Sequence, residues 1–290
     1  MPIISDAYES YRTLLHSIAY RMLGSYSEAE DIVQDVFVEY MRSDTESINH
    51  EKAYLIRMLT NRCLNLLQSA RKRKELYPGS WLPEPEITVL NDPAELYIER
   101  EALSYALLVM LEQLSAAERA VFILKESLNY SYSEIAACLH KSEVNCRKIY
   151  QRAKTKLQQE RAALPGNTSQ AAPLISAFIE AAQSGSYHKL VELLAEDAIL
   201  ISDGGGKVRA AYFPILRRER VLAFLKGVIP KGFLGDDCRM AVVNGQAGIV
   251  LMHGGHVSKM ISFQLDEQEQ RIERIFVVLN PEKLGYIHSS

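Results

Sequence analysis

"SYSEIAACLHKSEVNCRKIYQRAKTKL", residues 131–157, predicts two helices joined by a tight turn. Ser131 with Glu134 three residues later forms a capping box for the first helix, and Ser142 caps the second. His140 stands in the turn, where histidine tolerates a positive φ. The side chains expected to pack the two helices together are Ile135, Ala136, Leu139, Val144 and Ile149. Such a pair is a helix-turn-helix, whose second helix can enter the major groove of DNA.

The second helix of this pair is basic, and its first half carries side chains that can reach base edges or phosphates. The residues expected to contact DNA are Ser142, Glu143, Asn145, Arg147, Lys148, Gln151 and Arg152. An ordinary helical hairpin with a solvated basic face is the alternative interpretation. The capping box, the turn and the basic helix occur together, which favours DNA binding.

The composition is typical of a globular protein. The 290 residues suffice for two or three domains, with 48% hydrophobic and 24% charged residues. The net charge of -3 is unevenly spread, because residues 71–74 and 147–161 are basic whereas residues 25–51 are acidic. No apolar run is long enough to cross a bilayer, and the N-terminal residues lack the features of a signal peptide. We therefore expect a cytoplasmic protein that does not bind membranes.

The four cysteines indicate neither a metal site nor a disulfide framework. They are far apart in the sequence and form no C-x-x-C pair, standing at Cys63, Cys138, Cys146 and Cys238. We expect reduced, mostly packed thiols, and the sequence predicts no cofactor and no metal.

Two long amphipathic helices are predicted ahead of the helix-turn-helix. Ser27 with Glu30 three residues on forms a capping-box pattern for the first of them. Its apolar face is expected to comprise Ile32, Val33, Val36, Phe37, Tyr40 and Met41. Another face is polar and acidic, with Asp31, Gln34, Asp35 and Glu39. The second helix lies within residues 52–74, and its basic end is left to solvent.

Two linkers divide the chain. Residues 78–93 contain four prolines and the only tryptophan, a composition that forbids a helix and favours an extended segment. After the second linker come a helical stretch and several strand-like runs, which indicate an α+β domain. We therefore expect a multidomain chain of two all-α domains and one α+β domain. The expected boundaries are 1–76 and 96–163 for the helical domains, 77–95 and 164–173 for the linkers, and 174–290 for the α+β domain.

The glycine-rich stretch "ISDGGGKVR", residues 201–209, lacks the spacing of a phosphate-binding loop. Its glycines are contiguous, and Val208 follows Lys207 where such a loop has the hydroxyl that reaches Mg²⁺. We expect a turn instead. An acid–base site in this domain would need an Asp or His in an apolar cavity, and the candidates are Asp203, His253 and His256. Since a turn and a hairpin account for these positions equally well, we do not expect an enzyme.

Several motifs together resemble a known family. "RMLGSYSEAEDIVQDVFVEYMR", "AYLIRMLTNRCLNLLQSARKRK" and the helix-turn-helix are similar to regions 2 and 4 of bacterial extracytoplasmic-function sigma factors. "WLPEP" at 81–85, "DGGGK" at 203–207 and "NPEKL" at 280–284 match three signatures of the subgroup with a fused SnoaL-like C-terminal domain. The resemblance implies a dissociable RNA polymerase subunit that directs promoter-specific initiation. It also implies a region 2 helical bundle, a region 4 helix-turn-helix and a SnoaL-like cone.

The resemblance assigns roles to particular residues. It places the acidic helix on the clamp helices of the polymerase β′ subunit, region 4 on the β flap, and the helix-turn-helix residues above on the minus-thirty-five element. The residues implied in polymerase binding are Asp31, Gln34, Asp35 and Phe37. Those implied in binding the melted minus-ten element are Tyr54, Arg57, Asn61, Arg62, Asn65 and Arg71. Tyr54 stands where tryptophan is more usual in the family.

The three subgroup signatures suggest control in cis by the C-terminal domain. We expect Trp81 and Pro83 to hold the linker against this domain, although local packing of Trp81 on the sigma helices is the alternative. The residues expected in this contact are Trp81, Pro83, Asp203, Lys207, Asn280, Pro281, Lys283 and Leu284.

A second function stays open at this point. A conventional helix-turn-helix regulator could carry a C-terminal domain that senses a small ligand or is an enzyme. Such a regulator would bind duplex DNA alone and has no need of an acidic polymerase-docking helix. The "EDIVQDVF" pattern at 30–37 therefore favours the sigma factor.

Overall fold

The computed structural model describes residues 2–44, 48–89, 104–159, 171–235, 237–266, 268 and 270–285, with the backbone alone at 2–6, 70–75 and 159. The chain forms two compact units, residues 1–75 with 108–162 and residues 76–107 with 163–290. Residues 90–95 at the end of the first predicted linker and residues 164–170 at the start of the second lie outside the described residues.

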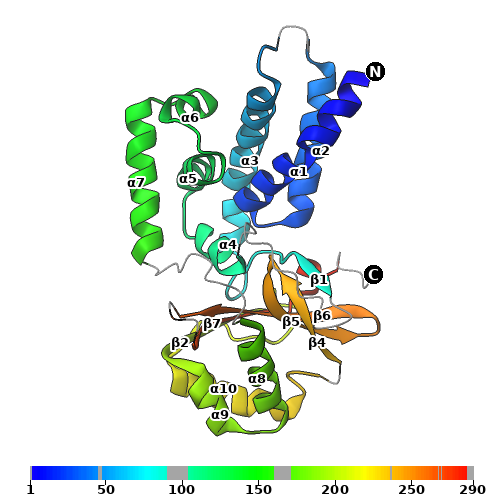
Figure 1. Cartoon of the computed structure of the whole chain (residues 1–290), viewed down its shortest axis with the longest axis vertical. Coiled ribbons are helices and arrows are strands. Elements are labelled where there is room, and N and C mark those ends of the chain that lie inside the picture. Colours follow the sequence, from blue (N-terminus) through cyan, green and yellow to red (C-terminus); the bar gives the residue numbers. More distant parts are fainter. Residues whose placement is uncertain are drawn as a thin grey trace. The chain divides into compact units, whose positions relative to one another are not determined.

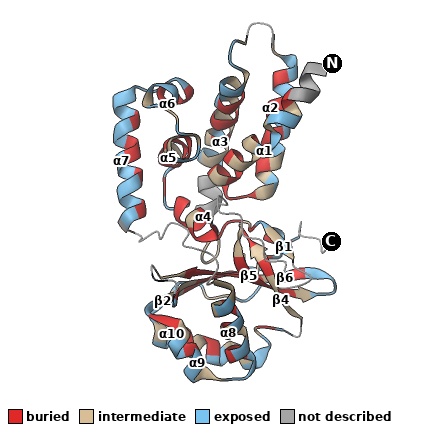
Figure 2. Cartoon of the chain, viewed as in Figure 1, coloured by how far each residue is buried: buried red, intermediate tan, exposed pale blue. Residues whose placement is uncertain are grey.

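The first unit is helical. Its described helices are α1 (Pro2–Leu23), α2 (Tyr26–Arg42), α3 (Glu51–Glu75), α5 (Ala116–Leu128), α6 (Tyr132–Leu139) and α7 (Glu143–Gln159), and α4 (Tyr105–Leu111) ends in it. α1 packs on α2, and α3 packs on α1, α2, α5 and α6. These helices bury one side and expose the other (Figure 2), as the spacing of apolar residues predicts.

The start of α2 differs from the prediction. Ser25, not Ser27, is its N-cap, and the Ser25 hydroxyl accepts a hydrogen bond from the Glu28 backbone N–H at 3.2 Å. Gly24, with φ 69°, ends the preceding helix and leaves Ser25 extended for the cap. The predicted apolar face is buried except at Met41, which is 48% exposed in the last turn of α2.

The helix-turn-helix has the predicted caps. Ser131 and Glu134 form both hydrogen bonds of the capping box, and His140 adopts a left-handed conformation with φ 51°. The Ser142 hydroxyl accepts the Asn145 N–H at 3.3 Å. One packing prediction was wrong, because Val144 is 63% exposed and Cys146, at 0%, takes the inward position.

The second unit is α+β, as predicted. The described strands are β1 (Ile87–Val89), β2 (Leu194–Asp203), β3 (Ile215–Leu216), β4 (Cys238–Val243), β5 (Gln246–His253), β6 (His256–Leu265) and β7 (Ile272–Val278). They form one sheet in the order β1-β4-β5-β6-β7-β2-β3, and neighbouring strands are antiparallel except for the parallel pair β2 and β7. Helices α8 (Ala171–Gln183), α9 (Tyr187–Leu193) and α10 (Arg218–Val228) cover one face (Figure 1). Short 3₁₀ turns are η4 (Ile229–Lys231) and η5 (Pro281–Lys283).

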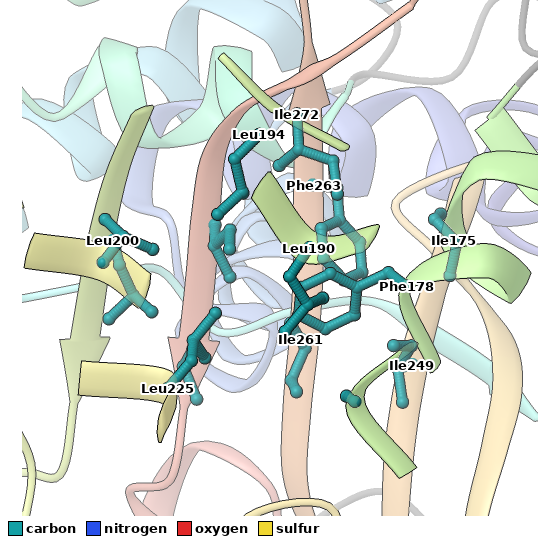
Figure 3. Packing of buried hydrophobic residues seen from close by; sticks show 14 of the residues in the cluster. Ile175, Phe178, Leu190, Leu194, Leu200, Leu225, Ile249, Ile261, Phe263 and Ile272 are labelled. Atoms are coloured by element: carbon teal, nitrogen blue, oxygen red, sulfur yellow. The ribbon is translucent and has the colours of Figure 1, made fainter. Parts of the chain in front are cut away.

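The core of this unit lies between the helices and the sheet. Phe178 of α8 meets Phe263 of β6 edge to face, with ring centres 5.2 Å apart (Figure 3). Leu190 of α9 and Leu225 of α10 are fully buried in the same cluster.

The proline-rich segment contributes a strand to this sheet. Ile87 pairs with Val243 of β4, and the Glu86 N–H donates to the Asn244 Oδ1 at 3.1 Å. The predicted linker is extended here, and an extended segment with β-branched residues is suited to pairing at a sheet edge. Residues 76–89 are therefore part of the second unit.

Candidate functional site

The predicted DNA-contacting residues of the helix-turn-helix are all exposed. They lie at Ser142, just before α7, and on α7 itself, as Glu143, Asn145, Arg147, Lys148, Gln151 and Arg152. The Arg147 guanidinium carbon is 4.7 Å from the Tyr132 ring centre, and its Nη2 lies 3.7 Å from the Glu143 Oε2. Ion pairs exposed to this degree contribute little to stability, so the Glu143 contact holds the Arg147 guanidinium only weakly.

The residues predicted to bind the melted minus-ten element lie along α3. Tyr54, Asn61 and Arg62 are half-buried, whereas Arg57 and Asn65 are exposed. The Arg57 guanidinium carbon is 5.5 Å from the Tyr54 ring centre. This α3 surface therefore presents an aromatic ring beside a cation, a combination that suits an unstacked base and its phosphate. The side chain of Arg71 lies outside the described residues.

Arg62 joins this surface to the acidic face of α2. Its Nη1 donates to the Asp35 Oδ2 at 3.0 Å, and its Nε donates to the Glu39 Oε2 at 3.2 Å. A residue predicted to bind DNA is thus paired with one predicted to bind polymerase. A charge change at Asp35 will also change the position of Arg62.

Three of the four predicted polymerase-binding residues are exposed on α2. These are Asp31, Gln34 and Asp35. Phe37 is only 4% exposed, and its ring meets the Tyr8 ring edge to face at 4.8 Å. Phe37 therefore stabilises α2 from within the first unit and does not lie on the exposed face.

The N-terminal helices and the helix-turn-helix domain pack together within the first unit. Arg119 of α5, whose side chain is 4% exposed, donates to the Met22 carbonyl at 2.7 Å and to Glu112 at 2.9 Å. A pocket of about 430 Å³ is lined by Tyr54 and Arg57 together with residues of α6. Both side chains therefore border a concave site formed with α6.

A cluster in the second unit connects the proline-rich segment to the end of β2. Asp203 is fully buried, and its carboxylate accepts hydrogen bonds from the Tyr77 hydroxyl at 2.6 Å and the Leu82 N–H at 2.9 Å. Lys283 Nζ lies 2.7 Å from the Asp203 Oδ2 and also donates to the Leu82 carbonyl. We call Tyr77, Trp81, Leu82, Asp203, Asn280 and Lys283 the clasp.

The aromatic residues of the clasp surround the lysine. Lys283 Nζ is 3.3 Å from the Trp81 ring centre and 4.9 Å from the Tyr77 ring centre. The two rings meet edge to face at 4.6 Å. Burial and, after it, the hydrogen bond to Asp203 raise the pKa of Tyr77 far above its usual value. The ammonium group thus has both a carboxylate and aromatic faces in a water-poor site, where cation–π attraction is strong.

The glycines of "DGGGK" allow close approach in the clasp. Gly205 and Gly206 have φ of +62° and +70°, and a Cβ on Gly205 would lie 2.5 Å from the Asn280 Nδ2. A Cβ on Gly206 would lie 2.6 Å from the Pro78 Cγ. The Gly205 N–H donates to the Asp203 carboxylate at 3.0 Å, which occupies the donor that a phosphate would need. The stretch is a turn shaped to receive the proline-rich segment.

Replacing Gly205 with alanine is expected to destabilise the second unit by about 2–4 kcal/mol, from a left-handed backbone and the displacement of Asn280 from Tyr77. Gly254→Ala is the matched control, since Gly254 has φ +58° but an added Cβ there meets nothing within 4 Å. It is expected to lose about 1–2 kcal/mol only. Urea unfolding of both variants measures the difference, and equal losses would contradict the role of close approach.

The remaining predicted contact residues lie around the clasp. Lys207 forms an exposed ion pair with Glu282, Pro281 is exposed, and Leu284 is buried. Pro83 is buried, and its carbonyl accepts the Tyr105 hydroxyl at 2.8 Å. Sequence reasoning missed Tyr77 and the Leu82 backbone, because neither carries a spacing signal that points to Asp203.

The candidate acid–base residues do not form a site. Asp203 belongs to the clasp, while His253 and His256 are exposed at the hairpin between β5 and β6. Within the described ranges, no group of three His, Cys, Asp or Glu side chains is placed to hold a metal ion. All four cysteines are free, and burial raises the pKa of Cys63 to about 12. None of the described helices is long and apolar enough to span a membrane.

Known proteins match the chain over most of its length. Residues 7–73 match the family model of Sigma-70 region 2, and residues 104–157 match that of Sigma-70, region 4. The ECF RNA polymerase sigma factor SigJ of Mycobacterium tuberculosis is 31% identical over 247 residues, which are 83% of this chain and 78% of the relative. The probable ECF RNA polymerase sigma factor SigI of the same organism is 33% identical over 66% of this chain and 67% of its own length.

Structural comparison agrees with these relatives. The crystal structure of Mycobacterium tuberculosis extracytoplasmic function sigma factor SigJ has a TM-score of 0.77 and 25% identity, covering 96% of this chain and 97% of that chain. The match includes the C-terminal helix-and-sheet unit, which is consistent with a SnoaL-like cone. The chain therefore belongs to the extracytoplasmic-function sigma factors, the RNA polymerase subunits that direct initiation at specific promoters.

Proposed function

We propose that this sigma factor binds core polymerase through the exposed acidic face of α2 and reads its promoter through α3 and α7. In this proposal the clasp controls the protein in cis. The C-terminal unit regulates and does not catalyse, since Asp203 is taken up by the clasp and both candidate histidines are at a hairpin. The protein acts where RNA polymerase acts, in the cytoplasm.

The clasp is the observation that carries the proposal of control. The single ammonium group of Lys283 binds both Asp203, 80 positions away in the chain, and Leu82, 201 positions away. Residues 76–107 connect the two sigma regions in sequence, yet they belong to the second unit. A domain that binds this connecting segment can shift the equilibrium between different arrangements of the two sigma regions. The size of the shift is set by the difference in contact free energy between those arrangements.

Promoter binding requires the two sigma regions to reach two separated elements. In the first unit they pack together, with Arg119 bridging α5 and α1 and with Tyr54 facing the pocket beside α6. We infer that this packed arrangement has to open on the promoter. The clasp then shortens the linker that is available between the two sigma regions for this opening. Residues that are held in the sheet cannot at the same time extend as part of a linker.

The single tryptophan allows a direct experiment. Protein labelled with 5-fluorotryptophan gives one ¹⁹F resonance, from position 81 inside the clasp. We expect this resonance to shift in Lys283→Met, and to shift again when core polymerase and promoter DNA are added to the wild type. A resonance that is insensitive to polymerase and promoter would contradict control through the clasp.

Reversing the charge of Asp31 and Asp35 together is expected to weaken binding to core polymerase at least about tenfold, or ~1.4 kcal/mol, because both carboxylates are exposed on α2. The matched control is the double change Glu196→Lys and Asp197→Lys, which alters the net charge equally at exposed positions of β2. Titration against core enzyme measures both. Equal affinities of the two double variants would remove the assignment.

A further inference from the structure

A cavity in the C-terminal unit lies beside the clasp but is not part of it. Its volume is about 490 Å³, within the usual range for small-ligand sites. It is bounded by α10, by the chain that follows α10, by residues 209–211, by Ser202 near the end of β2 and by Leu279 just after β7.

The walls of this cavity are mainly apolar. Phe224 and Phe233 line it, and their rings meet nearly at right angles with centres 6.4 Å apart. Val228 and Leu279 add aliphatic surface, and alanines contribute the rest of the wall near β2. Burial of an apolar body against these side chains is favourable by about 25 cal/mol per Å².

The charged groups at the cavity are all cations. Arg209 and Lys231 line it and are exposed. Lys259 lies behind Phe233, with its Nζ 4.2 Å from the ring centre and hydrogen-bonded to the Phe233 carbonyl. The Ser202 hydroxyl, which accepts the Ala211 N–H at 2.9 Å, keeps its own proton to donate. Among the residues that the structure describes, those lining the cavity include no Asp, Glu, His, Cys or Tyr, so they offer neither a general base nor a competing anion.

One glycine lines the cavity at an exposed position. Gly227 lies in the last turn of α10, and a Cβ added there would meet nothing within 4 Å. A larger side chain can therefore be placed at this part of the lining without a clash at its Cβ.

We propose that this cavity binds an organic carboxylate with an apolar body. The apolar body packs against Phe224, Phe233 and Val228, and the carboxylate pairs with Arg209 and Lys231. Ser202 donates a further hydrogen bond. The arrangement of cations over an apolar wall without acid or base groups is suited to binding and not to catalysis.

The cavity borders the clasp through the chain itself. Ser202 precedes Asp203 and Leu279 precedes Asn280, and the Asp203 carbonyl accepts both the Leu279 N–H at 2.8 Å and the Asn280 N–H at 3.0 Å. A ligand that contacts Ser202 and Leu279 therefore contacts the backbone that positions two clasp residues. An effect of the ligand on transcription rests on the proposed function, whereas the binding itself does not.

The binding test uses the full chain and the fluorescent probe 11-(dansylamino)undecanoate, displaced by decanoate. Gly227→Phe adds a ring to the cavity lining and is expected to weaken decanoate binding at least about tenfold while preserving the helix. The double variant Arg209→Glu and Lys231→Glu is also expected to bind decanoate at least about tenfold more weakly. The uncharged 1-decanol is expected to bind this variant and the wild type with equal affinity. Arg220→Glu, an exposed cation of α10 outside the lining, is the control and keeps wild-type affinity.

Two results would overturn the proposal. One is wild-type decanoate affinity in both Gly227→Phe and the double charge variant. The other is 1-decanol binding as tightly as decanoate to the wild type, which would remove the role of the cations. Gly227→Leu is a smaller replacement at the same position, in case the phenylalanine variant misfolds. Circular dichroism checks that both variants are folded. If decanoate binds as expected but leaves the 5-fluorotryptophan resonance unchanged, the ligand site stands and its link to the clasp fails.

Discussion

Replacing Lys283 with methionine is expected to destabilise the second unit by about 3–5 kcal/mol, the usual effect of removing one partner of a buried ion pair. The side chains of Lys283 and Asp203 are 5% and 0% exposed, so the carboxylate would stay buried without its counter-ion. Its remaining donors are the Tyr77 hydroxyl and the backbone N–H groups of Leu82 and Gly205. Urea unfolding followed by the fluorescence of Trp81 measures this loss, because the only tryptophan lies in the clasp.

Two further variants separate the clasp from a general effect of lost lysines. Lys207→Met removes an ion pair whose partners are 48% and 66% exposed, and we expect a change of about 0–1 kcal/mol. Asp203→Asn combined with Lys283→Met leaves no buried charge, and we expect it to recover part of the loss. A loss below 1 kcal/mol in Lys283→Met alone would show that the ion pair does not hold the clasp.

Arg147→Ala is expected to weaken recognition of the minus-thirty-five element by about 1–3 kcal/mol, or roughly 5- to 150-fold, if the guanidinium makes a bidentate base contact. Arg147 is exposed near the start of α7, and its partners Glu143 and Tyr132 hold it only weakly. Holoenzyme binding to a promoter and to the same promoter with an altered upstream element measures the effect.

The pattern of loss distinguishes two kinds of DNA contact. A loss confined to the intact element indicates base recognition, whereas an equal loss on both promoters indicates a phosphate contact. Lys154→Ala, exposed two turns further along α7, is the control and should lose less on the intact element. Binding of Arg147→Ala at the wild-type level on both promoters would place Arg147 away from the DNA.

Local features of the fold were predictable because their causes lie within a few residues. The Ser131 capping box, the left-handed His140 and the Ser142 cap follow from side chains three residues apart or from one backbone position. The same local reasoning gave the wrong cap for α2, because Gly24 ends α1 and moves the cap to Ser25. Periodicity also misplaced Met41 and Val144, which lie on the margins of their apolar faces.

The contacts of the clasp could not be worked out from spacing. Tyr77 and Asn280 are 203 positions apart, and only the completed sheet brings the end of β7 beside the end of β2. The motifs "WLPEP", "DGGGK" and "NPEKL" pointed to this neighbourhood by resemblance, without giving the pairing of atoms. The apolar cavity beside α10 had no sequence signal either, since its lining comes from β2, residues 209–211, α10, the chain after α10 and the residue after β7.

Promoter-specific transcription by core RNA polymerase tests control through the clasp most directly. Trp81→Ala and Lys283→Met break the clasp from its two sides, and each is compared with the wild type at equal concentrations of folded protein. We expect both variants to change transcript yield in the same direction, although neither residue belongs to the predicted DNA-binding surfaces. Wild-type yield from both variants, or changes in opposite directions, would contradict it.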